Sequence, residues 1–165
     1  MGRDECVRER CTRGRSGEGG ASAVEFALIL PVLILLLFGI VQFGIAYNRT
    51  QGLQAAAREG ARLASIGSSG NDIGARVRAS QSLFDSNDVQ IQIGAQKPGA
   101  TSWESHAFDT WGTQAPCSVA QVGGLVRVTA SVPPLDKYAI TIPLWGNREI
   151  TYTASGTFRC ERARS

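Results

Sequence analysis

One histidine and two nearby carboxylates are the residues whose types could support acid–base chemistry. His106 lies between Glu104 and Asp109 in the segment TSWESHAFDTW. A Ser-His-Asp triad or a multi-histidine metal site would have to use this histidine, but the segment contains no Gly-x-Ser-x-Gly motif and nothing in it fixes the geometry of the carboxylates. We therefore interpret it as an ordinary polar loop. The sequence predicts no enzyme activity, no metal site and no cofactor.

A further carboxylate occupies a more unusual setting. Glu25 stands near the start of GEGGASAVEFALILPVLILLLFGIVQFG, which covers residues 17–44. A carboxylate in hydrocarbon costs about 2 to 4 kcal/mol near the bilayer centre and less toward the interface. Its presence in this apolar segment therefore needs a specific reason.

The apolar segment is long enough to cross a membrane. Between Val24 and Ala46 the only ionisable side chain is Glu25, and the only other strongly polar one is Gln42. As a helix these residues would rise about 34 Å, against a hydrocarbon core of about 30 Å. We predict one membrane-spanning helix over residues 21–47.

The distribution of arginines predicts the orientation of this helix. Five arginines precede the span: Arg3, Arg8, Arg10, Arg13 and Arg15. The twenty residues after it hold three: Arg49, Arg58 and Arg62. By the positive-inside rule the N-terminus stays in the cytoplasm, and residues 48–165 lie outside it. The net charge of +3 is small and scattered, so we expect no nucleic-acid partner.

The four cysteines divide into two pairs by this orientation. Cys6 and Cys11 fall in the cytoplasmic leader, where no third or fourth zinc ligand is near in sequence. Cys117 and Cys160 fall in the exported part, where disulfides persist. We predict a disulfide between Cys117 and Cys160; two free buried thiols are the alternative.

The periods of apolar residues predict an α+β fold for the exported part. The first helix continues to about Ser65, and a short helix is expected from Ile73 to Phe84 with Asp72 as its N-cap. Alternation then predicts antiparallel strands in DVQIQIG, GLVRVTASV and EITYTASGTFRC, with YAITI, residues 138–142, as a candidate fourth. The connection over residues 94–122 is expected to be an exposed loop held at Cys117.

The outer half of the first helix carries a face of mostly small residues. Its members recur at steps of three and four: Leu53, Ala56, Ala57, Gly60, Ala61 and Ala64. Such side chains permit close backbone approach, either to the protein's own sheet or to another helix. Ala56, Gly60 and Ala64 are our candidate packing positions.

Four stretches of the sequence, the first two overlapping, carry a resemblance to known proteins. GGASAVEFALILPVL resembles the processing site of type IV prepilins, with a glycine, four uncharged residues, a glutamate, an aromatic residue and a long apolar run. The longer stretch VEFALILPVLILLLFGIVQFGIAYNRTQGLQAAAREGAR is similar to the TadE-like family of the tight adherence (Flp) pilus system. VRVTASVPPL and ITYTASGTF also resemble that family's strands.

This resemblance implies a processed, membrane-anchored pilin-like protein. A prepilin peptidase would cut between Gly20 and Ala21, so that Glu25 and Phe26 become the fifth and sixth residues of the mature chain. The implied domains are a leader (1–20), a transmembrane helix (21–47) and an extracytoplasmic TadE-like domain (48–165). The implied role is that of a minor pilin or pseudopilin in the inner membrane or in a pilus, with pilin subunits and the assembly machinery as partners.

Cleavage would also explain why a carboxylate, that of Glu25, stands in this apolar segment. It creates a positive amine on Ala21, one helical turn away, and a buried carboxylate is tolerable when it is paired. The partner would be this amine or that of a neighbouring subunit. The alternative is that Glu25 only complements the positive end of the helix dipole.

Two other interpretations of the N-terminal segment remain open. The helix could stay uncleaved, as a signal anchor that holds a small binding domain outside the membrane. Alternatively, Gly44-Ile45-Ala46 offers small residues suited to a signal peptidase, which would release a soluble domain. The three interpretations predict mature chains that begin at Ala21, Met1 or Tyr47.

Overall fold

The computed structural model describes residues 18–142 and 146–161. Most of the predicted leader, including Cys6 and Cys11, lies outside the described residues. The chain divides into two compact units, Met1–Leu37 and Phe38–Ser165.

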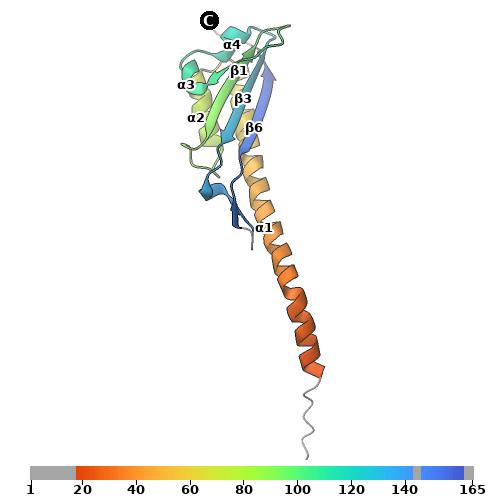
Figure 1. Cartoon of the computed structure of the whole chain (residues 1–165). Coiled ribbons are helices and arrows are strands. Elements are labelled where there is room, and N and C mark those ends of the chain that lie inside the picture. Colours follow the sequence, from red (N-terminus) through yellow and green to blue (C-terminus); the bar gives the residue numbers. More distant parts are fainter. Residues whose placement is uncertain (1–17, 143–145, 162–165) are drawn as a thin grey trace, which may run out of the picture. The chain divides into compact units, whose positions relative to one another are not determined.

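The predicted long helix is confirmed as α1, which runs from Glu18 to Ser65 (Figure 1). Its end is set by Gly67, whose φ of 85° is a left-handed conformation that suits glycine. The amide of Gly67 donates to the carbonyl of Ala64, and the amide of Ser68 donates to that of Leu63, both at 3.1 Å. These two bonds form a Schellman motif, which satisfies carbonyls that the end of the helix would otherwise leave free.

The second helix, α2, runs from Gly70 to Ser80, earlier than the predicted Ile73–Phe84. The prediction that Asp72 is its N-cap is wrong. Ser69 is the N-cap, and its hydroxyl oxygen accepts a hydrogen bond from the amide of Asp72. Asp72 instead lies in the first turn, where its charge complements the helix dipole.

The three predicted strands and a fourth one, β2, form an antiparallel sheet in the order β2-β1-β3-β6. Figure 1 shows β1, β3 and β6 side by side. β1 is Gln90–Gln96, β2 is Glu104–Ala107, β3 is Leu125–Val132 and β6 is Tyr152–Arg159. The predicted alternation holds in β3, where Val126, Val128, Ala130 and Val132 are buried. An α+β fold with one buried sheet face is therefore confirmed.

The expectation that residues 94–122 form only an exposed loop is wrong. They contain β2, the short helix α3 (Phe108–Trp111) and the short helix α4 (Pro116–Ala120). β2 takes the fourth place in the sheet, beside β1. The segment YAITI instead supplies β4 (Ile140–Ile142), which follows the 3-10 turn η1 (Asp136–Tyr138) and pairs with β5 (Gly146–Arg148) in a separate two-stranded sheet.

The core lies where two helical segments, α2 and the outer half of α1, meet the buried face of the sheet. Gly60 marks this point, because a Cβ there would stand 2.4 Å from a methyl of Val77 in α2 and 3.3 Å from one of Val128 in β3. No larger residue fits without displacing one of the three elements. This packing fixes the position of residues 53–64 of α1 on the sheet.

Candidate functional site

The predicted processing and assembly residues all lie in the first unit, near the start of α1. Gly20 and Ala21 follow the beginning of the helix at Glu18, and Glu25 lies one turn after Ala21. Glu25 is exposed, and Phe26 is 59% exposed. Around Gly20, no heavy atom outside its own helical surroundings lies within 4 Å of where a Cβ would be. The described part of the fold therefore leaves these residues open to partners.

The large apolar side chains that follow them are also uncovered. Every large hydrophobic residue from Val24 to Ile45, Leu30 apart, is at least 43% exposed. Burying such a surface releases roughly 25 cal/mol per Å², so a bare apolar helix of this size needs lipid or protein around it. Among the described residues there is one helix long and apolar enough to cross a membrane once, and it is α1.

The small-residue face in the second unit has the opposite environment. Ala56, Gly60 and Ala64 are buried, together with Leu53, Ala57 and Ala61. The side-chain amide of Gln54 donates to the carbonyl of Ser155 in β6 at 2.9 Å. Of the two partners left open by the sequence, this chain's own sheet and α2 occupy the face.

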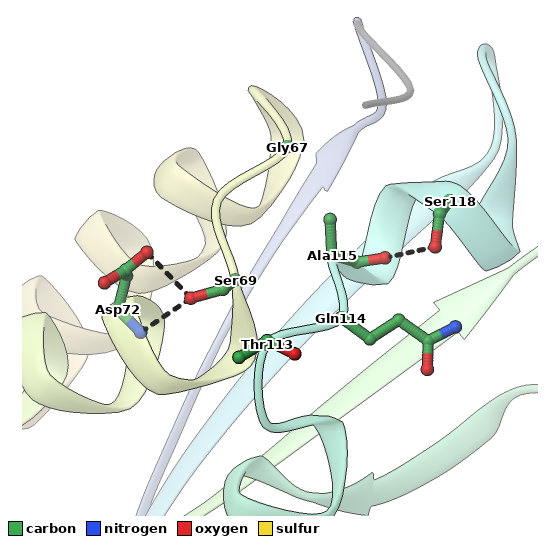
Figure 2. A pocket seen from close by; sticks show the side chains of 7 residues that line it. All are labelled: Gly67, Ser69, Asp72, Thr113, Gln114, Ala115 and Ser118. Carbon is green, nitrogen blue, oxygen red and sulfur yellow. Dashed lines mark hydrogen bonds between the residues drawn. The ribbon is translucent and has the colours of Figure 1, made fainter. Parts of the chain in front are cut away.

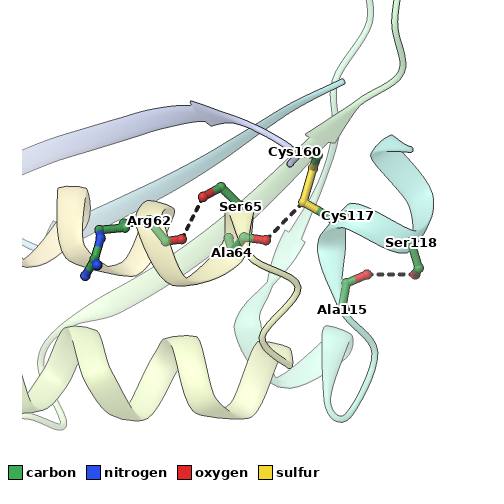
Figure 3. The surroundings of a disulfide bond; sticks show 7 residues. All are labelled: Arg62, Ala64, Ser65, Ala115, Cys117, Ser118 and Cys160. Atoms are coloured by element: carbon green, nitrogen blue, oxygen red, sulfur yellow. Dashed lines mark hydrogen bonds between the residues drawn. A yellow bond between two sulfur atoms is a disulfide. The ribbon is translucent and has the colours of Figure 1, made fainter. Parts of the chain in front are cut away.

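The disulfide between Cys117 and Cys160 joins α4 to the residue that follows β6 (Figure 3). Both cysteines are buried, and the Sγ atom of Cys117 lies 3.0 Å from the carbonyl oxygen of Ala64, near the end of α1. A disulfide sulfur carries no hydrogen, so this is a contact rather than a hydrogen bond. The amide of Glu161 donates to the carbonyl of Ser65 at 3.0 Å. The bridge thus lies beside the last residues of α1 and β6 and the first residues of α4.

A polar cluster around Tyr138 was not predicted. The Tyr138 hydroxyl donates to Oδ2 of Asp88 and accepts from the amide of Asp85, both at 2.8 Å. Lys137 Nζ lies 2.6 Å from a carboxylate oxygen of each aspartate. The guanidinium of Arg49 donates to the Tyr138 carbonyl at 3.2 Å. The cluster therefore ties the segment after β3 to α1 and to the residues before β1.

The charges of this cluster shift the pKa values of its members. Hydrogen bonds from Lys137 and then Tyr138 hold the pKa of Asp88 below its ordinary value. Hydrogen bonds to Asp85 and then Asp88 raise the pKa of Lys137. Burial raises the pKa of the Tyr138 hydroxyl. Each shift favours the protonation state that makes the observed bonds.

A surface hollow of about 400 Å³ lies beside the start of α2 (Figure 2). The Ser69 hydroxyl on its wall donates to Oδ2 of Asp72 at 2.7 Å, and the Ser118 hydroxyl donates to the carbonyl of Ala115 at 2.7 Å. These polar groups already serve the ends of two helices. We assign no ligand to this hollow.

The three residues considered for acid–base chemistry are distributed over β2 and α3. Glu104 and His106 are exposed on β2, which corrects their placement in a loop, and the His106 ring lies 6.0 Å from that of Trp111. Asp109 is in α3, where its carboxylate accepts from the amide of Thr110. Within the described residues no group of three or more His, Cys, Asp or Glu side chains could hold a metal ion.

Comparison with known proteins identifies one family. Residues 20–62 match the family model described as TadE-like protein, which confirms the resemblance over the apolar half of α1 and most of its buried small-residue face. Neither the curated proteins nor the solved structures yield a match to this chain. The match points to a component associated with the tight adherence pilus, and α1 is consistent with a single-pass membrane anchor.

Proposed function

We propose that this protein is a minor pilin or pseudopilin of the tight adherence pilus system. Its role is structural rather than enzymatic. A prepilin peptidase removes residues 1–20, residues 21–47 remain in the inner membrane, and residues 48–165 lie outside the cytoplasm. Its partners are other pilin-type subunits and the inner-membrane assembly machinery.

The observation that carries this proposal is where the family match begins. It starts at Gly20, the residue before the proposed cut, and continues through the uncovered apolar residues of α1. No heavy atom outside the helical surroundings of Gly20 lies within 4 Å of where a Cβ would stand, so no other described element covers the proposed cut. Within the second unit, the outer half of the same helix is packed on the sheet through the buried small-residue face.

Glu25 is the proposed assembly residue. Cleavage leaves a positive amine on Ala21, and four residues of helix place it about 6 Å along the axis from Glu25. Where water is scarce, opposite charges at such a distance attract strongly, and neither is tolerable alone. Pairing between the carboxylate and the amine of a neighbouring subunit would set the axial register of two helices. Phe26, 59% exposed beside it, would add an apolar contact.

The start of the mature chain tests this proposal against its alternatives. Protein extracted from membranes of cells that contain a prepilin peptidase should have the intact mass of a chain beginning at Ala21. The uncleaved, signal-anchored binding domain would begin at Met1, and a domain released by a signal peptidase would begin at Tyr47. Loss of the Ala21 form in cells without the prepilin peptidase should accompany the expected result.

A further inference from the structure

The sheet of the second unit has an open edge at β6. This strand ends the order β2-β1-β3-β6, so no other described strand pairs with its outer side (Figure 1). β6 contains neither proline nor lysine, the residues with which proteins commonly protect such an edge. Its last three residues, Thr157, Phe158 and Arg159, are all exposed. The end of β6 is therefore accessible to another chain.

The hydrogen bonds of Cys160 show which backbone groups of β6 face this edge. The amide of Cys160 donates to the carbonyl of Gly124 at 2.8 Å, and its carbonyl accepts from the amide of Gly123 at 3.0 Å. Cys160 thus bonds inward, toward the residues before β3. In an antiparallel pair this direction alternates from one residue to the next. Thr157 and Arg159 therefore direct their amide and carbonyl groups outward, away from β3.

One row of side chains on α1 runs along the same edge. The side-chain amide of Gln54 donates to the carbonyl of Ser155 at 2.9 Å, as the alternation in β6 requires of a carbonyl that faces outward. Arg58 and Arg62 follow Gln54 at steps of four and so lie on the same side of the helix. The Cα of Arg58 is 2.8 Å from where a Cβ of Gly156 would stand. Two arginines of α1 therefore line the edge of β6.

The side chains around this edge are mainly basic. Arg58 and Arg159 are exposed, and neither makes an ion pair or hydrogen bond with another described residue. Arg62 lies 3.7 Å from Glu59, a carboxylate that also pairs with α2. β6 has no carboxylate of its own, and Glu161 follows only after the strand has ended. The edge therefore attracts a negatively charged partner.

The outer face of the sheet adds a further arginine. Arg127 of β3 lies opposite Thr157, and its Nε donates to the Thr157 hydroxyl at 3.4 Å. Its guanidinium carbon is 4.1 Å from the centre of the Trp103 ring, a cation–π contact that fixes the charge near β6. Glu104 is the one carboxylate of the four strands, and it lies opposite the buried Ala95, on the other face.

Phe158 indicates the second property of the partner. It lies opposite the buried Val126, on the face that packs against the helices, yet it is 39% exposed. An added strand would cover this ring with an apolar side chain and, by alternation, place its carboxylates on the outer face beside Arg159. The β6 strand of a second copy does not fit, because it would bring like charges together.

We propose that the end of β6 binds an extended acidic segment of another protein by β-strand addition. The backbone of the segment pairs with Thr157 and Arg159. Its carboxylates lie beside Arg159, within the field of the α1 arginines, and its apolar side chains cover Phe158. The inference rests on the fold of the second unit and does not depend on cleavage at Gly20.

A peptide of about nine residues, in which glutamate and valine alternate, is the probe that tests this proposal. It is added to the full ¹⁵N-labelled chain in a zwitterionic detergent, and amide hydrogen exchange is followed by NMR. The amides of Thr157 and Arg159 should exchange at least tenfold more slowly in the complex. The matched control is β2, the other edge of the sheet, which has Glu104 and no arginine. No protection at β6, or equal protection at β2, would overturn the proposal.

Two further peptides separate strand pairing from attraction between charges. One has the same side chains but a methyl group on every backbone nitrogen, so it has no amide hydrogen to donate to an edge carbonyl. The other replaces each glutamate with lysine. Both should bind at least tenfold more weakly than the first peptide. If the methylated peptide binds equally well, the edge attracts any polyanion and strand addition is wrong.

Substitutions in the chain test the arginines. Arg58→Gln and Arg159→Gln should each weaken binding of the glutamate–valine peptide at least threefold, since each removes one exposed charge beside the edge. Arg148→Gln is the matched control, because Arg148 is equally exposed but lies in the other sheet. Affinities that are unchanged in the first two variants, or lowered equally in all three, would contradict the proposal. None of these measurements reports on the N-terminus, so failure here is distinct from failure of processing.

Discussion

The backbone of Gly156 in β6 lies directly against the backbone of Ala57 in α1. A Cβ at position 156 would stand 2.7 Å from the Ala57 carbonyl oxygen and 2.8 Å from the Cα of Arg58. Neither atom can move without moving the helix. The outer half of α1 is therefore docked on the sheet through the main chain as well as through its small side chains.

Gly156→Ala should destabilise the folded domain by about 1 to 3 kcal/mol, because the added methyl group overpacks a contact between two backbones. Denaturant unfolding of the full chain in detergent measures this. Ser155→Ala is the matched control, since Ser155 is exposed on the same strand and the change adds no atoms. Equal stability of Gly156→Ala and Ser155→Ala would show that α1 does not dock as closely as described.

Removing the disulfide should cost about 4 kcal/mol, because Cys117 and Cys160 are separated by 43 residues and the reduced chain gains the entropy of that open loop when it unfolds. Cys160→Ser and reduction of the native protein should lower the unfolding midpoint by similar amounts. Reductant should have no further effect on the variant. If both thiols of the native exported protein react with an alkylating agent, the bridge does not exist in the cell.

The Tyr138 cluster predicts how stability depends on pH. The lowered pKa of Asp88 contributes stability that is present above about pH 4 and is lost as the pH falls through the folded value. The raised pKa values of Lys137 and Tyr138 contribute stability that is present below about pH 10 and is lost as the pH rises through theirs. The melting temperature should therefore fall on both sides of a plateau.

Asp88→Asn should lose less stability on acidification than the unmodified protein does, since the amide has no charge to neutralise. Asp136→Asn serves as the control, because Asp136 is exposed in the adjoining turn and its carboxylate makes no hydrogen bond or ion pair with another described residue. Its profile should follow that of the unmodified protein. If the melting temperatures of all three proteins fall equally as the pH is lowered, Asp88 is not responsible for the loss of stability in acid.

The elements with long, regular periods were predictable from the sequence. Val126, Val128, Ala130 and Val132 alternate because β3 is a central strand with one buried face. The small residues of α1 recur at helical spacing because they pack on the sheet and on α2. In both cases one environment acts along the whole element, so it leaves a repeating pattern.

Other features leave no such pattern. All four residues of β2 are exposed at the edge of the sheet, so nothing alternates, and α3 and α4 are too short to show a helical period. The bond between Tyr138 and Asp88 joins residues 50 positions apart. Only the tertiary fold brings such residues together. The processing residues were recognised from a motif, since a bare helix imposes no contacts on them.

Glu25→Gln separates processing from assembly. The neutral amide is cheaper to place in lipid, so insertion should be preserved, and cleavage after Gly20 should largely persist because the substitution is five residues away. Association with other pilus subunits should fail, because a buried amine loses its partner at a cost of about 3 to 5 kcal/mol. Crosslinking and co-purification measure this association.

Ala23→Gln is the control for Glu25→Gln, because it adds the same amide at a nearby exposed position and keeps the carboxylate. It should associate better than Glu25→Gln. If Glu25→Gln is cleaved and crosslinked normally, Glu25 does not pair with the amine and only complements the helix dipole.

The intact mass of Gly20→Val after expression with a prepilin peptidase tests whether the chain is cut between Gly20 and Ala21. Gly39→Val is its matched control, since both glycines lie in α1 with open space where a Cβ would be. We expect a chain beginning at Ala21 for the unmodified protein and for Gly39→Val, and a full-length chain beginning at Met1 for Gly20→Val. A Gly20→Val protein that still begins at Ala21, or an unmodified protein that begins at Met1 or Tyr47, would contradict it.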